Sequence, residues 1–175
     1  MTMRKRIALI STGGTIEKTY DHLSGVLANR VSVLDVMLAS LELRGAVIER
    51  FPLMNKDSLD MTPEDHTRIA ETAIQLARDS DGVVVVHGTD RLAVSGDRVV
   101  EMLRPVAAPA KPIVFTGAMR PYELRSTDAM QNLTEALLAV QLVAPGVYVA
   151  MHSQVLQFPG VVKDHTAGAF VKATQ

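Results

Sequence analysis

Short apolar runs rich in β-branched residues recur along the chain and alternate with segments whose apolar residues have helical spacing. Each run is short and ends at polar, glycine or proline residues, which predicts five buried strands: Ile7–Ile10, Ala46–Phe51, Val83–Val86, Ile113–Phe115 and Val147–Met151. The segments between them predict four helices: Val33–Leu43, Pro63–Ala77, Val94–Leu103 and Asp128–Val143. Alternating strands and helices need crossover connections, so we expect an α/β fold with a doubly wound, mainly parallel sheet and helices on both faces.

The second predicted helix has a well-specified start. Thr62 is a suitable N-cap, Pro63 suits the first helical position, and Glu64 and Asp65 place negative charge where the helix dipole favours it.

Composition limits both the size of the fold and its partners. With 175 residues, 47% of them hydrophobic, the chain can bury one proper core, so a single domain spanning residues 1–175 is expected. The 18 basic and 19 acidic residues give a net charge of −1, which argues against nucleic-acid and membrane partners. There are no cysteines, which excludes disulfides and thiolate chemistry. The apolar run Ile7–Ile10 is too short for a signal peptide or a membrane span, so we expect a cytoplasmic protein.

Polar residues and glycines follow four of the predicted strands. The segments that follow them are Ser11–Thr15, Asn55–Ser58, His87–Asp90 and Thr116–Arg120. Ligands of open α/β sheets bind beyond the carboxyl ends of the strands, where the strand order reverses. The sequence therefore predicts a site at this edge of the sheet.

Taken singly, each of these segments also has an ordinary structural interpretation. Gly13 and Gly14 can simply form a tight turn. A phosphate-binding loop is not supported, because neither G-x-x-x-x-G-K-[ST] nor G-x-G-x-x-G is present. Asp90 can be a helix cap, and His87 is more typical of a structural histidine than of a base, so we assign it no catalytic role.

In combination, the motifs resemble those of the bacterial-type asparaginases. The chain carries STGGTI, HGTD and TGAMRP in the family's order, each after a predicted strand. Ser126–Leu133 matches the pattern S-x-D-x-x-x-N-L, and Val161–Asp164 continues the match. The resemblance covers essentially the whole chain. It implies the fold of an asparaginase N-terminal domain and hydrolysis of the side-chain amide of L-asparagine to aspartate and ammonia.

The resemblance also implies roles for individual residues. Thr15 matches the family's nucleophile, and Tyr20 matches a loop tyrosine that closes over the substrate. Thr89 matches the second threonine, Asp90 the acid that holds the substrate's amino group, and Lys163 the lysine paired with Thr89.

The expected substrate site includes further residues of the same turns. Asp57 and Ser58 match the segment that holds the substrate carboxylate, and Ala118 aligns with a backbone carbonyl that receives the leaving nitrogen. The full substrate-binding set is Gly14, Asp57, Ser58, Gly88, Thr89, Asp90 and Ala118. No metal and no cofactor are expected.

Amide hydrolysis needs a nucleophile, a route for its proton and stabilisation of the oxyanion. The backbone N–H groups of Thr15 and Thr89 are candidate oxyanion donors. The polar segment Glu17–Gly25, which carries Tyr20 and follows a glycine hinge, is predicted to be a lid that orders over the substrate.

Two departures from the family pattern are visible. The family's usual C-terminal domain of roughly a hundred residues, which lends a carboxylate to a neighbouring site, has no counterpart in this sequence. Leu59 occupies a position where the family commonly has Gln or Ser.

Two alternative functions stay open: the amidase subunit of a tRNA-dependent amidotransferase, and a catalytically silent amino-acid sensor. Apolar helix faces such as Leu133–Val143 predict a homo-oligomer, a dimer or a tetramer.

Overall fold

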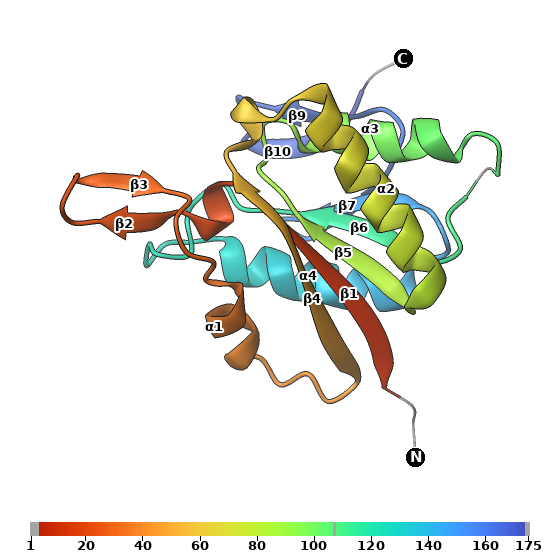
Figure 1. The fold of residues 1–175 in the computed structure, drawn as a ribbon, viewed down its shortest axis with the longest axis horizontal. Coiled ribbons are helices and arrows are strands. Elements are labelled where there is room, and N and C mark those ends of the chain that lie inside the picture. Colours follow the sequence, from red (N-terminus) through yellow and green to blue (C-terminus); the bar gives the residue numbers. More distant parts are fainter. Residues whose placement is uncertain (1–3, 107, 174–175) are drawn as a thin grey trace.

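The computed structural model describes residues 4–106 and 108–173, so both ends of the expected 1–175 domain lie outside the described residues. Its centre is a six-stranded sheet in the order β4-β1-β5-β6-β7-β8 (Figure 1). The strands are β4 (Ala46–Lys56), β1 (Lys5–Gly13), β5 (Gly82–Val86), β6 (Ile113–Thr116), β7 (Val147–Met151) and β8 (Gln154–Gln157). All neighbours pair in parallel except β7 and β8, so the predicted α/β fold with a mainly parallel sheet is confirmed.

Helices cover both faces of the sheet. α2 (Pro63–Asp79) and α3 (Leu92–Leu103) pack on one face, and α1 (Leu34–Ala39) and α4 (Ala129–Leu142) on the other (Figure 1). The side chains of β5 alternate between the two cores, with Val83 and Val85 in the first and Val84 and Val86 in the second. This alternation follows from the twofold repeat of a strand and explains why a buried central strand is apolar throughout.

Three predicted elements illustrate how local sequence sets element ends. α2 begins as predicted, with a capping box between Thr62 and Asp65. α1 is shorter than the predicted helix 33–43: it ends before Ser40, whose hydroxyl donates to the Val36 carbonyl. β4 extends beyond the predicted strand through Pro52, which lacks an N–H; this is tolerated because β4 lies at the edge of the sheet.

Several short elements were not predicted from the sequence. β2 (Thr19–Asp21) and β3 (Val26–Ala28) form a hairpin that extends away from the sheet (Figure 1), and β9 (Val161–Asp164) pairs with β10 (Ala169–Lys172). Single 3-10 turns, η1 (Thr15–Glu17) and η2 (Ser58–Asp60), follow β1 and β4. Such elements are too short to give a periodic signal.

The strand order reverses next to β1. The chain leaves β1 for β4 on one side and later returns to β5 on the other, so the connections that follow β1 and β5 run in opposite directions. Loops that diverge in this way open a crevice at the carboxyl ends of the two strands, where ligands bind in doubly wound sheets. Among the described residues, no helix is both long and apolar enough to cross a membrane.

Candidate active site

Two glycines bring the loops after β1 and β5 into contact. A Cβ atom added to Gly14 would lie 2.4 Å from the Cα of Gly88, and one added to Gly88 would lie 2.6 Å from the Ser58 hydroxyl oxygen. Gly14 also has a φ of +81°, which residues with a side chain rarely adopt. Glycine is therefore required here for close approach. Thr15 directly follows Gly14, and Thr89 directly follows Gly88. The close contact of the two glycines therefore brings the backbones of these two threonines near each other at the crevice.

Lys163 contacts both predicted residues of the loop after β5. Its ammonium donates to the Thr89 hydroxyl oxygen at 2.9 Å and to the Asp90 carboxylate at 2.6 Å. The lysine comes from β9 and its side chain is only 13% exposed, so it is not the solvated surface lysine that its position after a turn also allows. The alternative that Asp90 caps α3 is wrong, because the N-cap residue is Arg91.

Thr15 and Tyr20 have no such partners. Thr15 is half-buried at the first position of η1, where its N–H has no acceptor within the turn. Tyr20 lies on β2 with 57% of its surface exposed. Within residues 4–106 and 108–173, neither hydroxyl forms a hydrogen bond to another residue, so the geometry leaves both free to contact a ligand.

The predicted lid begins later than residue 17. Glu17 is buried, and its carboxylate accepts hydrogen bonds from the Gly13 N–H at 3.2 Å and from the Ser32 hydroxyl at 2.5 Å. Burial raises the pKa of Glu17, although the hydrogen bond from Ser32 and the charge of Arg50 oppose the rise. Glu17 therefore belongs to the fixed base of the glycine turn, and the part of the segment that extends from the body is the β2–β3 hairpin.

Asp57 is already paired. Its carboxylate accepts from the Lys18 ammonium at 2.7 Å and from the Leu59 N–H at 3.1 Å, which caps η2. The hydrogen bond from Lys18 lowers the pKa of Asp57. Ser58 is buried beside Gly88, and its hydroxyl accepts from the Arg91 N–H at 3.3 Å. Leu59 is 59% exposed. Ser58 is thus buried against the turn after β5, whereas Asp57 holds η2 to the segment before the hairpin.

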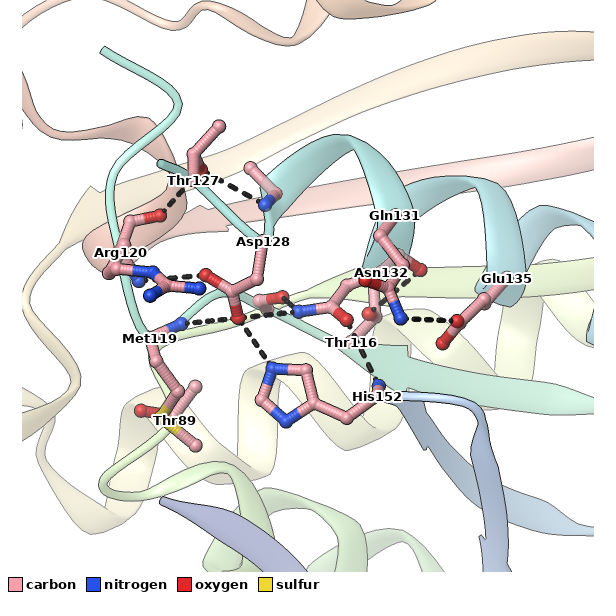
Figure 2. Close-up of polar contacts among 12 residues, drawn as sticks. Thr89, Thr116, Met119, Arg120, Thr127, Asp128, Gln131, Asn132, Glu135 and His152 are labelled. Atoms are coloured by element: carbon pink, nitrogen blue, oxygen red, sulfur yellow. Dashed lines mark hydrogen bonds and ion pairs between the residues drawn. The ribbon is translucent and has the colours of Figure 1, made fainter. Parts of the chain in front are cut away.

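A buried carboxylate holds the loop that contains Ala118 (Figure 2). Asp128 accepts from the backbone N–H groups of Met119 at 3.0 Å and Arg120 at 2.9 Å, and it contacts His152 Nε2 at 2.7 Å. Burial alone raises the pKa of a carboxyl group, but these donors outweigh it, and the pKa of Asp128 lies below its ordinary value. The backbone on the C-terminal side of Ala118 is therefore fixed by one side chain.

Asn132, one helical turn after Asp128, fixes the other side of the same loop. Its amide donates to the Gly117 carbonyl and to Asp128, both at 2.9 Å, and its oxygen accepts from the His152 N–H at 3.1 Å (Figure 2). Ala118 lies between these anchors and is 1% exposed. The i, i+4 spacing of the S-x-D-x-x-x-N pattern places Asp128, the N-cap residue of α4, and Asn132, in its first turn, on the same side of the helix, which explains that spacing.

Three supporting residues were missed from the sequence. His152 follows the fifth predicted strand, so extending the strand-end rule from four strands to five was enough to find it. Asn29 donates to the Gly14 carbonyl at 2.8 Å, and Lys18 holds Asp57. No local pattern marks these last two, because their partners are 15 and 39 residues away.

The comparisons agree with this arrangement of elements. The family model described as "Asparaginase, N-terminal" matches residues 6–172. The chain belongs to the asparaginase family. Its relatives in this family include the L-asparaginase of Thermococcus kodakarensis, which is 33% identical over 165 residues. They also include a glutamyl-tRNA(Gln) amidotransferase subunit of Haloquadratum walsbyi, which is 36% identical over 150 residues.

Solved structures of the family show the same fold. The thermostable L-asparaginase from Thermococcus kodakarensis superposes with a TM-score of 0.84 at 32% identity. The probable cytoplasmic L-asparaginase from Campylobacter jejuni superposes with a TM-score of 0.78 at 34% identity. The two matches cover 95% and 97% of this chain but only 51% and 53% of those chains. The sequence alignment with the T. kodakarensis asparaginase covers 93% of this chain and 49% of that protein. The alignment with the H. walsbyi protein covers 84% of this chain and 33% of that protein.

Proposed function

We propose that this asparaginase-family chain is an L-asparaginase that hydrolyses the side-chain amide of asparagine through an acyl ester on Thr15. The contact of Lys163 with both Thr89 and Asp90, beside the glycine turn that carries Thr15, is the observation that carries the proposal. This contact places a hydroxyl, an ammonium and a carboxylate next to Thr15, whose hydroxyl has no hydrogen-bond partner among the described residues. These groups supply a nucleophile, proton donors and acceptors, and an anchor for the substrate's amino group.

The proposed reaction has two steps. Thr15 Oγ1 attacks the amide carbon, and the bond to nitrogen breaks; the hydroxyl proton leaves with the nitrogen as ammonia, assisted by Tyr20. Water then attacks the ester, oriented by Thr89 and Lys163, and restores the Thr15 hydroxyl while releasing aspartate. In the first step the carbonyl oxygen gains negative charge, which the N–H groups of Thr15 and Thr89 stabilise.

The substrate is proposed to lie across the crevice with its charged end toward Asp90 and Ser58. Asp90 accepts from the α-ammonium group, and the leaving nitrogen faces the Ala118 carbonyl. We expect asparagine to be preferred over glutamine, but one extra methylene changes binding by only about 1–3 kcal/mol, so some glutaminase activity is expected.

Ammonia release from asparagine by the purified protein tests the proposal. We expect release without RNA or a second protein. A second candidate is the amidase subunit of an amidotransferase, because the H. walsbyi amidotransferase protein matches 84% of this chain at 36% identity, about as well as the T. kodakarensis asparaginase matches 93% of it at 33%. Release only with a partner favours that candidate, and binding of asparagine without any release favours a silent sensor.

We further propose that the protein is cytoplasmic and forms a dimer or tetramer through its one α/β unit. The support for assembly is a pair of exposed leucines one turn apart on α4: Leu138 is 57% exposed and Leu142 is 73% exposed. Sedimentation at micromolar concentration tests it, and a monomer would refute it.

A further inference from the structure

A chain of buried hydrogen bonds runs from α2 to the turn that precedes Thr89. His66 Nδ1 lies 2.7 Å from the Ser95 hydroxyl oxygen, and that oxygen lies 2.8 Å from His87 Nε2. His87 Nδ1 in turn lies 2.8 Å from the carbonyl oxygen of Gly88. His66 is 5% exposed, and Ser95 and His87 are fully buried. None of these three side chains takes part in the proposed chemistry.

The direction of every hydrogen bond in this chain follows from its last member. A carbonyl oxygen only accepts, so His87 Nδ1 must carry a proton. Burial lowers the pKa of His87 to about 4, so the ring is neutral near pH 7 and its Nε2 is an acceptor. Ser95 therefore donates to His87, and its oxygen accepts the proton of His66 Nδ1. The lone pair that remains on His66 Nε2 has no partner among the described residues, so the chain ends there.

The acceptor of this chain belongs to the peptide that joins Gly88 and Thr89. The peptide is trans, so its C=O and N–H point in opposite directions. Because His87 holds the C=O toward the protein interior, the Thr89 N–H is directed away from it. Within the described ranges no group accepts a hydrogen bond from this N–H, although Thr89 is only 4% exposed. A buried donor without a partner is costly unless a ligand pairs with it.

The preceding peptide, which joins His87 and Gly88, is packed tightly on several sides. Gly14, which directly follows β1, lies against this peptide, and Ser58 of η2 lies against Gly88. A Cβ added to Gly117 would lie 2.3 Å from the His87 carbonyl oxygen, so the loop after β6 also contacts this turn. Packing therefore fixes the position of Gly88, and the hydrogen bond from His87 determines the rotation of the Gly88–Thr89 peptide that follows it.

We propose that His66, Ser95 and His87 are positioning residues, which orient the Gly88–Thr89 peptide so that the Thr89 N–H faces the carbonyl oxygen of the bound amide. The proposal rests on the proposed function. Oriented backbone donors act chiefly on the transition state, in which the oxygen becomes negative. Loss of the chain should therefore lower kcat more than it changes KM, and the effect should decrease with distance from Gly88.

Ser95→Ala is the main test, because it removes the central hydroxyl without adding volume. We expect kcat for asparagine to fall about 10- to 30-fold, while KM changes less than about threefold. The expected fall in kcat is smaller than the roughly 100- to 1,000-fold fall seen when an oxyanion donor is removed completely, because the Thr89 N–H is still present in this variant. His66→Phe leaves the bond from Ser95 to His87 in place and should have a smaller effect than Ser95→Ala.

Ser80→Ala is the matched control. Ser80 is a partly buried serine at the end of α2, whose hydroxyl donates to the carbonyls of Leu76 and Gly82, away from the site. Its loss should lower stability and leave kcat unchanged. An equal fall of kcat in Ser80→Ala and Ser95→Ala overturns the positioning role.

A second measurement does not depend on turnover. In ¹⁵N spectra of the imidazole rings, assigned with the single histidine variants, His66 and His87 should both carry their proton on Nδ1 at pH 7. A proton on His87 Nε2 overturns the proposal. A parent protein that releases no ammonia overturns both the proposed function and the positioning role, whereas an active parent with an unaffected Ser95→Ala variant overturns the positioning role alone.

Discussion

At the scale of single residues, substitution of Thr15 is the most direct test of the proposed chemistry. Thr15→Ala removes the proposed nucleophile, so ammonia release from asparagine should fall at least about a thousandfold, and no acyl ester should be detectable by mass spectrometry after acid quenching. Thr19→Ala removes a hydroxyl four residues later and should retain activity. If Thr15→Ala keeps most of its turnover while Thr89→Ala loses it, Thr89 is the nucleophile instead.

Lys163 is predicted to affect rate more than affinity. It contacts Thr89 and Asp90 rather than being proposed to bind the substrate itself. Lys163→Met should lower kcat about a hundredfold, the usual contribution of a proton-transfer group. Steady-state kinetics between pH 6 and 9 measure this. Lys172→Met is the matched control, because Lys172 lies on the neighbouring β10 and its ammonium donates to the carbonyls of Gln157 and Pro159. Unchanged kcat in Lys163→Met would exclude a catalytic role.

At the scale of elements, the contact between the turns after β1 and β5 predicts different outcomes for two glycines with similar backbones. Gly14 has a φ of +81° and no room for a Cβ, whereas Gly25, at the tip of the hairpin, has a φ of +70° and nothing within 4 Å. Gly25→Ala should cost only backbone strain, about 1 kcal/mol. Gly14→Ala must also separate the two turns, so it should lower the melting temperature further and abolish activity. Equal melting temperatures in the two variants would contradict the close contact.

The β2–β3 hairpin is predicted to order when substrate binds. An isolated two-stranded hairpin has marginal stability, and this one exposes Tyr20 and Leu23. Hydrogen exchange of amides 19–28 should slow when the protein is saturated with aspartate, while exchange in α2 stays the same. Tyr20→Phe should reduce kcat but leave this protection in place. Exchange in the hairpin that is unaffected by aspartate would count against a lid.

At the scale of the whole molecule, buried histidines should make the fold sensitive to acid. Burial lowers the pKa of His87 from 6.5 to about 4, and burial together with the charge of Arg91 lowers that of His66. The unfolded chain therefore binds protons that the folded protein excludes. The resulting stability is fully present above pH 6.5 and is lost as the pH falls toward 4, by about 3 kcal/mol for His87.

Urea unfolding at pH 7.5 and pH 5 measures this effect. We expect His87→Gln to be less stable at pH 7.5 but to lose less stability on acidification than the parent. His22→Gln changes an exposed histidine of the hairpin and should behave like the parent. If the parent and His87→Gln depend on pH equally, His87 does not supply the acid sensitivity.

Fold class and strand ends could be predicted because they depend on local features. Short continuous runs of β-branched residues mark buried strands such as β5, helical spacing of apolar residues marks the helices, and Thr62 and Pro63 mark the start of α2. A lone GGT or HGTD has an ordinary interpretation as a turn. It was their joint occurrence after successive strands, together with the family resemblance, that predicted a site at one edge of the sheet.

Only the tertiary structure determined which side chains meet and what each is free to do. Lys163, whose pairing with Thr89 the family resemblance implied, also contacts Asp90 across 73 residues. Asp57 is paired with Lys18, and the His66–Ser95–His87 chain joins two helices to one turn. Such contacts depend on packing between elements, and they leave no periodic trace in the sequence. Sequence alone determined the elements and the order of the loops at the site, because helix and strand periods act over a few residues. The fold decided the hydrogen-bond partners. A buried polar group must be paired, and its partner is whichever group the packing of the elements brings next to it.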